Sequence, residues 1–302
     1  MKKLYGILVL GLVLSLTLTA CEKKGARSAD HGDDDDDEEI TDTDGDGVAD
    51  AEDEFPDNPL FGSLSTSIVS GEALVRQVTK MYEQRVRASR SAMEIGWCNE
   101  PSIAKENPTD SEFPVPYVDN ERLDVACPNR NTGEPFCADT YAYLNDKTVT
   151  DFRMDVTVES NPDEAWMIMI RANADGTEGI AIAYDPWAHR WRKWPGGEDR
   201  PFGIFSVSSM DGYNTNDPEH PYIGYHRIGE KTFRVRQEED VHQLTIEAIG
   251  PRITVHDNGK LVLSVEDEGE SYTSGKIGFR TWMGGCMKVK TLSIADKLPT
   301  AE

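Results

Sequence analysis

From residue 148 onward, apolar and polar side chains alternate in short runs, which is the pattern of half-buried β-strands. In the first run, Phe152, Met154, Val156 and Val158 are separated by polar residues. Further runs follow at 166–170, 180–184, 202–207, 233–235, 244–246, 253–256, 261–265, 277–280 and 287–294. The sequence Asp-Asn-Gly at 257–259 is typical of a tight hairpin between two of them. Short strands at regular spacing predict an all-β fold, an antiparallel β-sandwich.

Residues 71–93 have a helical rather than an alternating pattern. Ser70 can cap a helix there, with Glu72 in the first turn. Residues 99–147 are rich in proline and predict irregular structure. We therefore expect residues 60–147 to be a helix plus a disulfide-held loop region that packs on the sandwich. Whether this region forms part of the sandwich is open. The apolar positions at helical spacing are Leu74, Val75, Val78, Met81, Tyr82 and Val86.

The N-terminus has the pattern of an export signal. Lys2 and Lys3 precede an uncharged apolar stretch at 4–18, which is too short for an ordinary spanning helix. The tetrapeptide at 18–21, Leu-Thr-Ala-Cys, resembles the lipobox of bacterial lipoproteins. The resemblance implies that residues 1–20 are a signal peptide and that Cys21 carries an acyl anchor such as palmitate. By similarity to enteric lipoproteins, Glu22 favours the outer membrane, on its periplasmic or its surface face.

Charge is distributed unevenly along the chain. The formal net charge is −24, and residues 33–54 contain fourteen acidic side chains and no basic one. Such a run cannot bury a core and repels itself, so we expect residues 21–41 to form a disordered acidic tether. An acidic surface also argues against nucleic acid as a partner, because phosphate binding needs clustered lysine and arginine.

Residues 42–59 predict a calcium site. The sequence Asp-Thr-Asp-Gly-Asp-Gly-Val-Ala-Asp-Ala-Glu-Asp at 42–53 resembles a thrombospondin type 3 repeat, and the Phe-Pro-Asp-Asn-Pro sequence at 55–59 fits the linker of such repeats. An EF-hand fits less well, because position twelve is Asp rather than Glu and no amphipathic helix precedes the loop. A glycine at position six permits the sharp turn that a calcium loop needs. The expected ligands are the carboxylates of Asp42, Asp44, Asp46, Asp50 and Asp53 and the backbone carbonyl of Val48.

Four cysteines besides Cys21 predict two disulfides in an oxidising compartment. Cys127 and Cys137 are close in sequence and can close a local loop. The remaining pair, Cys98 and Cys286, would then tie the start of the folded part to its last strand. A metal site formed by these cysteines is disfavoured, because no C-x-x-C or His-x-x-x-His pair is present.

The C-terminal half resembles a known family. The order Leu-Thr-Ile-Glu-Ala-Ile-Gly at 244–250, Ile-Thr-Val-His-Asp-Asn-Gly at 253–259, Asp267 and Gly-Lys-Ile-Gly-Phe-Arg at 275–280 is similar to concanavalin A-like (laminin G-like) jelly rolls. The resemblance covers about residues 148–296 and implies a jelly-roll domain there, with residues 297–302 as a tail. Because this fold hosts lectins, glycanases, lyases and adhesion modules, the resemblance does not decide the activity.

Evidence for catalysis is sparse. The family's hydrolases carry an E-x-D-x-x-E strand, which is absent from this sequence. A polysaccharide lyase would need a base beside a cation that neutralises a uronate. His226, Tyr225 and Arg280 are the candidates for those roles, although a lone histidine on a strand is more often structural.

The aromatic residues point more towards binding. Trp191 and Trp194 alternate with basic residues, and Trp282 follows Arg280 near the last strand. Indole faces stack on sugar rings, and arginine can bind a carboxylate or a sulfate. Some of these tryptophans can instead belong to the core. The expected ligand-binding residues are Arg190, Trp191, Arg192, Trp194 and Trp282.

Three functions are therefore compatible with the sequence. The first is a membrane-anchored lipoprotein that binds an extracellular carbohydrate, such as an acidic polysaccharide, through a jelly roll. The second is a glycoside hydrolase or polysaccharide lyase on the same fold. The third is a structural or adhesive envelope protein without a sugar site.

Overall fold

The computed structural model describes residues 41–80, 85–89, 91–96, 98, 122–124, 140–160, 165–185, 202–214, 222–234, 240–269, 272–281 and 285–298. The predicted signal peptide, the acidic tether to residue 40, Cys21 and the predicted Cys127–Cys137 disulfide lie outside these residues. No helix among the described residues is long and apolar enough to cross a membrane.

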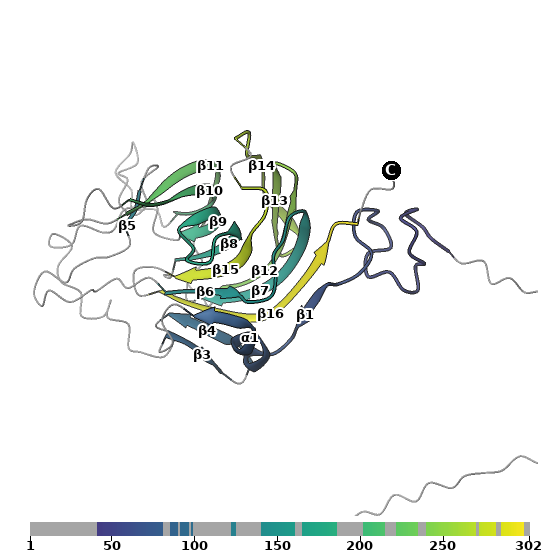
Figure 1. Ribbon diagram of the computed structural model, residues 1–302, viewed down its shortest axis with the longest axis horizontal. Coiled ribbons are helices and arrows are strands. Elements are labelled where there is room, and N and C mark those ends of the chain that lie inside the picture. Colours follow the sequence, from purple (N-terminus) through teal and green to yellow (C-terminus); the bar gives the residue numbers. More distant parts are fainter. Residues whose placement is uncertain are drawn as a thin grey trace, which may run out of the picture. The chain divides into compact units, whose positions relative to one another are not determined.

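The described strands form two antiparallel sheets that pack as a jelly-roll β-sandwich (Figure 1). The first sheet follows the order β14 (Lys260–Glu266), β13 (Arg252–Asp257), β12 (Asp240–Ile249), β7 (Phe152–Ser160), β16 (Cys286–Asp296), β4 (Met93–Gly96) and β3 (Val86–Ala88), with β1 (Thr66–Ile68) also paired to β16. The second sheet follows the order β2 (Val78–Lys80), β6 (Thr140–Leu144), β15 (Lys276–Thr281), β8 (Trp166–Ala172), β9 (Glu178–Asp185), β10 (Phe202–Asn214), β11 (Tyr222–Arg234) and β5 (Arg122–Asp124).

The predicted strands after residue 148 are confirmed. In β7 buried and partly exposed residues alternate along the whole strand, so Phe152, Met154, Val156 and Val158 all enter the core between the sheets. The β13–β14 hairpin turns at Asn258 and Gly259, whose φ angles of 51° and 72° are those of a tight hairpin turn. Burying a large apolar side chain stabilises the fold by about 1.5–3 kcal/mol, so this alternation fixes the strand register.

The predicted helix at 71–93 is mostly wrong. Helix α1 (Gly71–Gln77) begins as expected, since the Ser70 side chain accepts a hydrogen bond from the Ala73 amide. The chain then enters β2 at Val78, and β3 and β4 follow within the range that the periodicity assigned to the helix. Val78 and Val86 are buried because they belong to strands paired with β6 and β4. β-Branched side chains pack well in sheets, and long-range pairing has overridden the local periodicity here.

The sandwich begins well before residue 148. Strands β1 to β4 and β6 all lie in the two sheets, and β5 pairs with the first residues of β11. The region 60–147, which we expected to be a helix and loops packed on a jelly roll, therefore contributes strands to both layers. The periodicity missed these strands because most of them are only three to five residues long.

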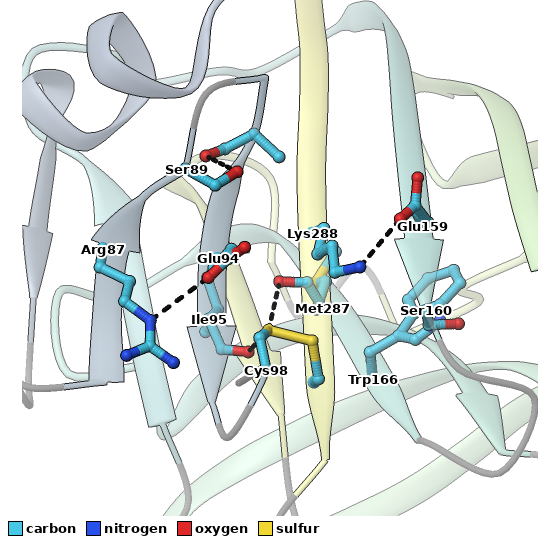
Figure 2. The surroundings of a disulfide bond; sticks show 12 residues. Arg87, Ser89, Glu94, Ile95, Cys98, Glu159, Ser160, Trp166, Met287 and Lys288 are labelled. Carbon is cyan, nitrogen blue, oxygen red and sulfur yellow. Dashed lines mark hydrogen bonds and ion pairs between the residues drawn. A yellow bond between two sulfur atoms is a disulfide. The ribbon is translucent and has the colours of Figure 1, made fainter. Parts of the chain in front are cut away.

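The predicted disulfide between Cys98 and Cys286 is present and joins the end of β4 to the start of β16 (Figure 2). The two strands are already paired, with Cys286 opposite Gly96. Around the bridge, Arg87 forms an ion pair with Glu94 across β3 and β4, and Lys288 forms one with Glu159 across β16 and β7. The last strand is thus fixed covalently to the N-terminal part of the fold.

Replacing both Cys98 and Cys286 with serine should lower the free energy of unfolding by about 2–5 kcal/mol, because the bridge spans 188 residues and restricts the unfolded chain. Guanidinium denaturation under oxidising conditions measures the change. Adding reductant to the double variant is the control, because it isolates the effect of any other disulfide. An unchanged denaturation midpoint would contradict a stabilising role for the bridge.

Candidate functional site

The second sheet buries side chains on both of its faces. All seven residues of β8 are buried, in contrast to the alternation of β7. Ile168 and Ile170 face the core between the sheets, as the sequence predicts. Met167 and Met169 face the opposite side, which we call the outer face, and belong to a second apolar cluster there. Its members are Tyr141, Ala165, Met167, Met169, Ala172, Ala181, Ala183, Met210 and Tyr225, with Tyr143 packed against them.

The strand register orders this outer face into rows. One row crosses β6, β15, β8, β9 and β10 through Tyr141, Arg280, Met167, Ala183 and Ser206. The next row crosses the same strands through Tyr143, Gly278, Met169, Ala181 and Ser208. Methionine and alanine therefore form the centre of the face, with tyrosine and arginine on one side and hydroxyl groups on the other.

Several polar groups on this face are buried. Ser208 is 0% exposed, and in the part of the chain that the structure describes its Oγ has no hydrogen-bond partner. Ser206 Oγ lies 3.4 Å from Tyr225 Oη. Arg280 is 3% exposed, and its guanidinium carbon lies 5.1 Å from the centre of the Tyr141 ring. Because leaving a buried polar group unpaired costs free energy, the Ser208 hydroxyl, which has no partner among the described residues, is a candidate functional position.

Two glycines position the Tyr141 ring. A Cβ at Gly278 would lie 2.5 Å from Tyr141 Oη, and a Cβ at Gly176 would lie 2.6 Å from Tyr141 Cζ. The ring therefore fits between a strand and a loop only because neither residue has a side chain. Tyr143 stacks beside it, with ring centres 6.0 Å apart and planes inclined by 29°. Tyr143 is only partly buried, so it is the accessible member of the pair.

The structure does not bring the three candidate lyase residues together. Tyr225 is 0% exposed on the outer face, whereas its neighbour His226 has a side chain that is 57% exposed and paired with Asp211. Arg280 lies on β15, four strands away from β11 in the sheet order. Strands are spaced about 4.8 Å apart, so these side chains are separated by roughly 19 Å across the sheet. The expected base and cation pair is therefore not assembled from these residues.

His226 instead belongs to a polar group that the sequence did not reveal. Its Nε2 pairs with the Asp211 carboxylate across β10 and β11. Nearby, Tyr272 Oη donates a hydrogen bond to the Met210 carbonyl at 2.5 Å. Burial and the carboxylates of Asp211 and Glu178 raise the pKa of Tyr272. No local motif marks this group, because its members come together only through strand pairing.

The predicted ligand-binding residues Arg190, Trp191, Arg192, Trp194 and Trp282 lie outside the described residues. The outer-face residues of β6 and β10 were not predicted as site residues. Tyr141 and Tyr143 were overlooked because they lie in the region that we interpreted as irregular. The alternation in Thr-Tyr-Ala-Tyr-Leu at 140–144 is the signal that could have identified them.

The acidic loop at 42–53 has the oxygen donors that Ca²⁺ prefers. Carboxylate oxygens of Asp42, Asp44 and Asp46 lie within 4.8 Å of one another. One oxygen each of Asp44, Asp46 and Asp53 is shielded from solvent and has no hydrogen-bond partner among the described residues. Ca²⁺ takes six to eight hard oxygen ligands, so shielded carboxylate oxygens without donors fit such an ion.

Two expected ligands accept hydrogen bonds within the loop, and the Asp42 carboxylate accepts them from the Gly45 and Gly47 amides at 2.8 and 3.0 Å. The Asp50 carboxylate accepts hydrogen bonds from the Thr43 amide and the Thr43 hydroxyl, both at 2.7 Å. These bonds lower the pKa of Asp50. Loss of solvent and the carboxylates of Asp46, Asp53 and Asp42 raise the pKa of Asp44. Asp50 thus shapes the loop, while Asp44 lies among like charges that a cation would relieve.

No protein-family model and no curated protein matches this sequence. Among solved structures, a carbohydrate-binding module (CBM66) from Bacillus subtilis is similar with a TM-score of 0.40 and 16% identity, over 52% of this chain and 82% of that one. A protein of unknown function with a galectin-like fold, also from Bacillus subtilis, gives 0.46 and 11% over 79% and 98%. A legume lectin-like domain from Entamoeba histolytica gives 0.43 and 11% over 76% and 96%. Similarity at this level carries no argument about ligand or activity.

Proposed function

We propose that this chain is a lipid-anchored protein of the bacterial cell envelope that binds an extracellular carbohydrate through its jelly roll. The observation that supports sugar binding most is the outer face of the second sheet. There the partly exposed Tyr143 stacks on Tyr141, and the same sheet face contains Arg280 and the buried hydroxyl of Ser208, which has no hydrogen-bond partner among the described residues. The lipobox-like sequence at Cys21 supports the anchor and a position at the outer membrane.

The chemistry of this face suits a sugar. Aromatic rings bury the apolar side of a pyranose, and hydroxyl groups satisfy its hydrogen-bonding edge. Guanidinium groups bind carboxylates and sulfates through paired hydrogen bonds. The tryptophan and arginine residues at 190–194 and Trp282 lie outside the described residues, and their chemistry favours an acidic polysaccharide as the ligand.

Removing the Ser208 hydroxyl should affect binding and stability in opposite directions. We expect Ser208→Ala to raise the free energy of unfolding of the ligand-free chain by about 1 kcal/mol, because a buried unpaired polar group is lost. The same variant should bind glycan about tenfold more weakly, since a tenfold change corresponds to about 1.4 kcal/mol. Denaturant unfolding and a polysaccharide array, followed by titration of the best glycan, measure the two effects with the full chain.

Two variants are matched to this test. Ser264→Ala on β14 removes a hydroxyl from the first sheet and should leave glycan affinity unchanged. Tyr143→Ala should weaken binding, whereas Tyr143→Phe should retain it because stacking needs only the ring. Binding that is absent from every glycan, or unaffected by Ser208→Ala and Tyr143→Ala, would refute the proposed site. Release of reducing ends or unsaturated uronates during the titration would assign catalysis instead.

We also propose that residues 42–53 bind one Ca²⁺ ion. The carboxylates of Asp42, Asp44, Asp46, Asp50 and Asp53 and the Val48 carbonyl would hold it. The unpartnered oxygens of Asp44, Asp46 and Asp53 support this assignment. The ion would neutralise carboxylates that otherwise repel one another and would stiffen the segment between the tether and the sandwich.

Asp44→Asn should lower calcium affinity at least tenfold in calorimetric titrations of the full chain. Asp57→Asn is the matched control, because Asp57 is an exposed acid that is not among the proposed ligands. The raised pKa of Asp44 means that protons compete with calcium, so affinity should fall as the pH is lowered through that pKa. Equal losses in both variants would show that calcium binds only to diffuse negative charge.

A further inference from the structure

The acidic loop continues into the segment 54–65, which forms backbone hydrogen bonds to β16, the last strand of the sandwich, and to the residues just after it. The Glu54 amide donates to the Gly62 carbonyl at 3.0 Å. The Leu298 amide, just beyond β16, donates to the Leu60 carbonyl at 2.8 Å, and the Ser65 amide donates to the Ile294 carbonyl at 2.8 Å. Strand β1 then pairs with β16, beside the point where the loop meets the sheet (Figure 1). The loop is thus attached to the C-terminal end of the fold by backbone hydrogen bonds.

Aromatic packing reinforces this attachment. Phe61 is 0% exposed, and its ring centre lies 5.9 Å from that of Phe55 in an edge-to-face arrangement. The Arg153 guanidinium carbon lies 5.2 Å from the centre of the Phe55 ring. Arg153 belongs to β7, so Phe55 connects the acidic segment directly to the outward side of the first sheet.

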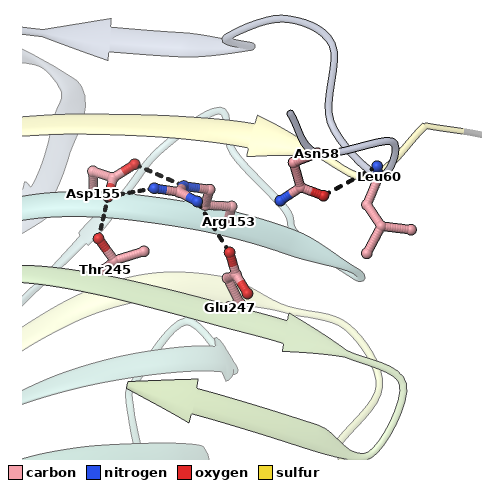
Figure 3. A network of polar contacts seen from close by, with 6 residues as sticks. All are labelled: Asn58, Leu60, Arg153, Asp155, Thr245 and Glu247. Atoms are coloured by element: carbon pink, nitrogen blue, oxygen red, sulfur yellow. Dashed lines mark hydrogen bonds and ion pairs between the residues drawn. The ribbon is translucent and has the colours of Figure 1, made fainter. Parts of the chain in front are cut away.

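Arg153 is held in place by its own network (Figure 3). It pairs with Asp155 at 3.0 Å and with Glu247 at 3.1 Å. Asp155 in turn accepts a hydrogen bond from the Thr245 hydroxyl at 2.5 Å. Because charges from β7 and β12 fix the guanidinium, the surface that Phe55 contacts is preorganised.

The proposed calcium ligands contact the same segment. A Cβ at Gly62 would lie 2.8 Å from Val48 Cγ2 and 3.4 Å from Asp46 Oδ2, and 3.4 Å from Leu298 Cδ1. Val48 and Asp46 therefore pack closely against the backbone of Gly62. The positions of two proposed ligands and the attachment to the last strand depend on one another.

We infer that the segment 54–65 is a calcium-dependent clamp between the tether and the sandwich. This inference rests on the proposed calcium site. The carboxylates of the loop repel one another, and the ion relieves that repulsion in the conformation that packs on Gly62. By linkage, whatever strengthens docking on the sandwich also strengthens calcium binding, and the reverse. Calcium would thereby determine whether the acidic loop packs rigidly on the sandwich or moves independently of it.

Hydrogen exchange and calcium titration of the full chain test the clamp together. Calcium should slow exchange of the Ser65 and Leu298 amides at least tenfold relative to chelator. The exchange rates of amides in the β12–β13 pair should be the same with calcium and with chelator, and these amides are the internal control. Phe55→Ala should weaken calcium binding about fivefold to tenfold although Phe55 is not a ligand. Phe55→Leu should lower calcium affinity by less, because it retains part of the apolar contact. Leu261→Ala, an exposed apolar change on β14, should leave calcium affinity unchanged.

The outcomes separate the two proposals. A wild-type chain that binds no calcium would overturn the calcium site and the clamp with it. Calcium binding that Asp44→Asn abolishes but Phe55→Ala leaves intact, with unchanged exchange at Ser65 and Leu298, would retain the site and overturn the clamp. Should Phe55→Ala fail to fold, the exchange of the wild-type amides decides the matter alone.

Discussion

In the second sheet, strands β8 and β9 bury side chains on both faces, so a polar group there needs a partner within the chain or from a ligand. An ordinary antiparallel sheet can leave one face to water, and the first sheet does so, with Arg153, Asp155 and Glu247 on its outward side. The second sheet has methionine and alanine where such polar residues would be expected. Because the hydroxyl of Ser208 and the guanidinium of Arg280 are both buried on this face, water does not solvate them. Both groups are therefore candidates for contact with a ligand.

The same constraint separates two kinds of charged residue in the sandwich. Arg171 is buried, but its guanidinium donates to the carbonyls of Thr150, Gly250 and Tyr272 and pairs with Asp151. Its role is therefore to join loops at one end of the fold, and burial, its largest effect, lowers its pKa. Arg280 lies over the Tyr141 ring on the outer face. The two buried arginines thus lie at different places in the fold, Arg171 among loops at one end and Arg280 on the outer face.

The sequence predicted most strands from 152 to 296, and the alternation is clearest in β7, whereas only the end of β11 was predicted. It failed between 78 and 144 for a physical reason. Val86 in β3 has a partner only because β4 pairs with β16, nearly two hundred residues later in the chain. The local pattern of apolar residues does not indicate such a distant partner. The spacing of Leu74 and Val78 fits a helix as well as it fits the observed helix followed by a strand. The Cys98–Cys286 disulfide was predicted because Cys127 and Cys137 are close in sequence, and pairing these two with each other leaves Cys98 and Cys286.

Strand β16 receives both N-terminal attachments along the same edge. Its first residues, Cys286 to Val289, pair with β4, and Leu292 to Ile294 pair with β1. On its other edge it pairs with β7. The sandwich therefore cannot close until the end of the chain has been made, a topology of long-range contacts that slows folding. Once closed, the covalent bridge at one end of β16 and the Phe55–Phe61 segment at the other fix the same strand. The segment that follows the acidic loop is therefore joined to β7 through Phe55 and to the C-terminal end of β16 through Leu60 and Ser65, and β1 continues this attachment along β16.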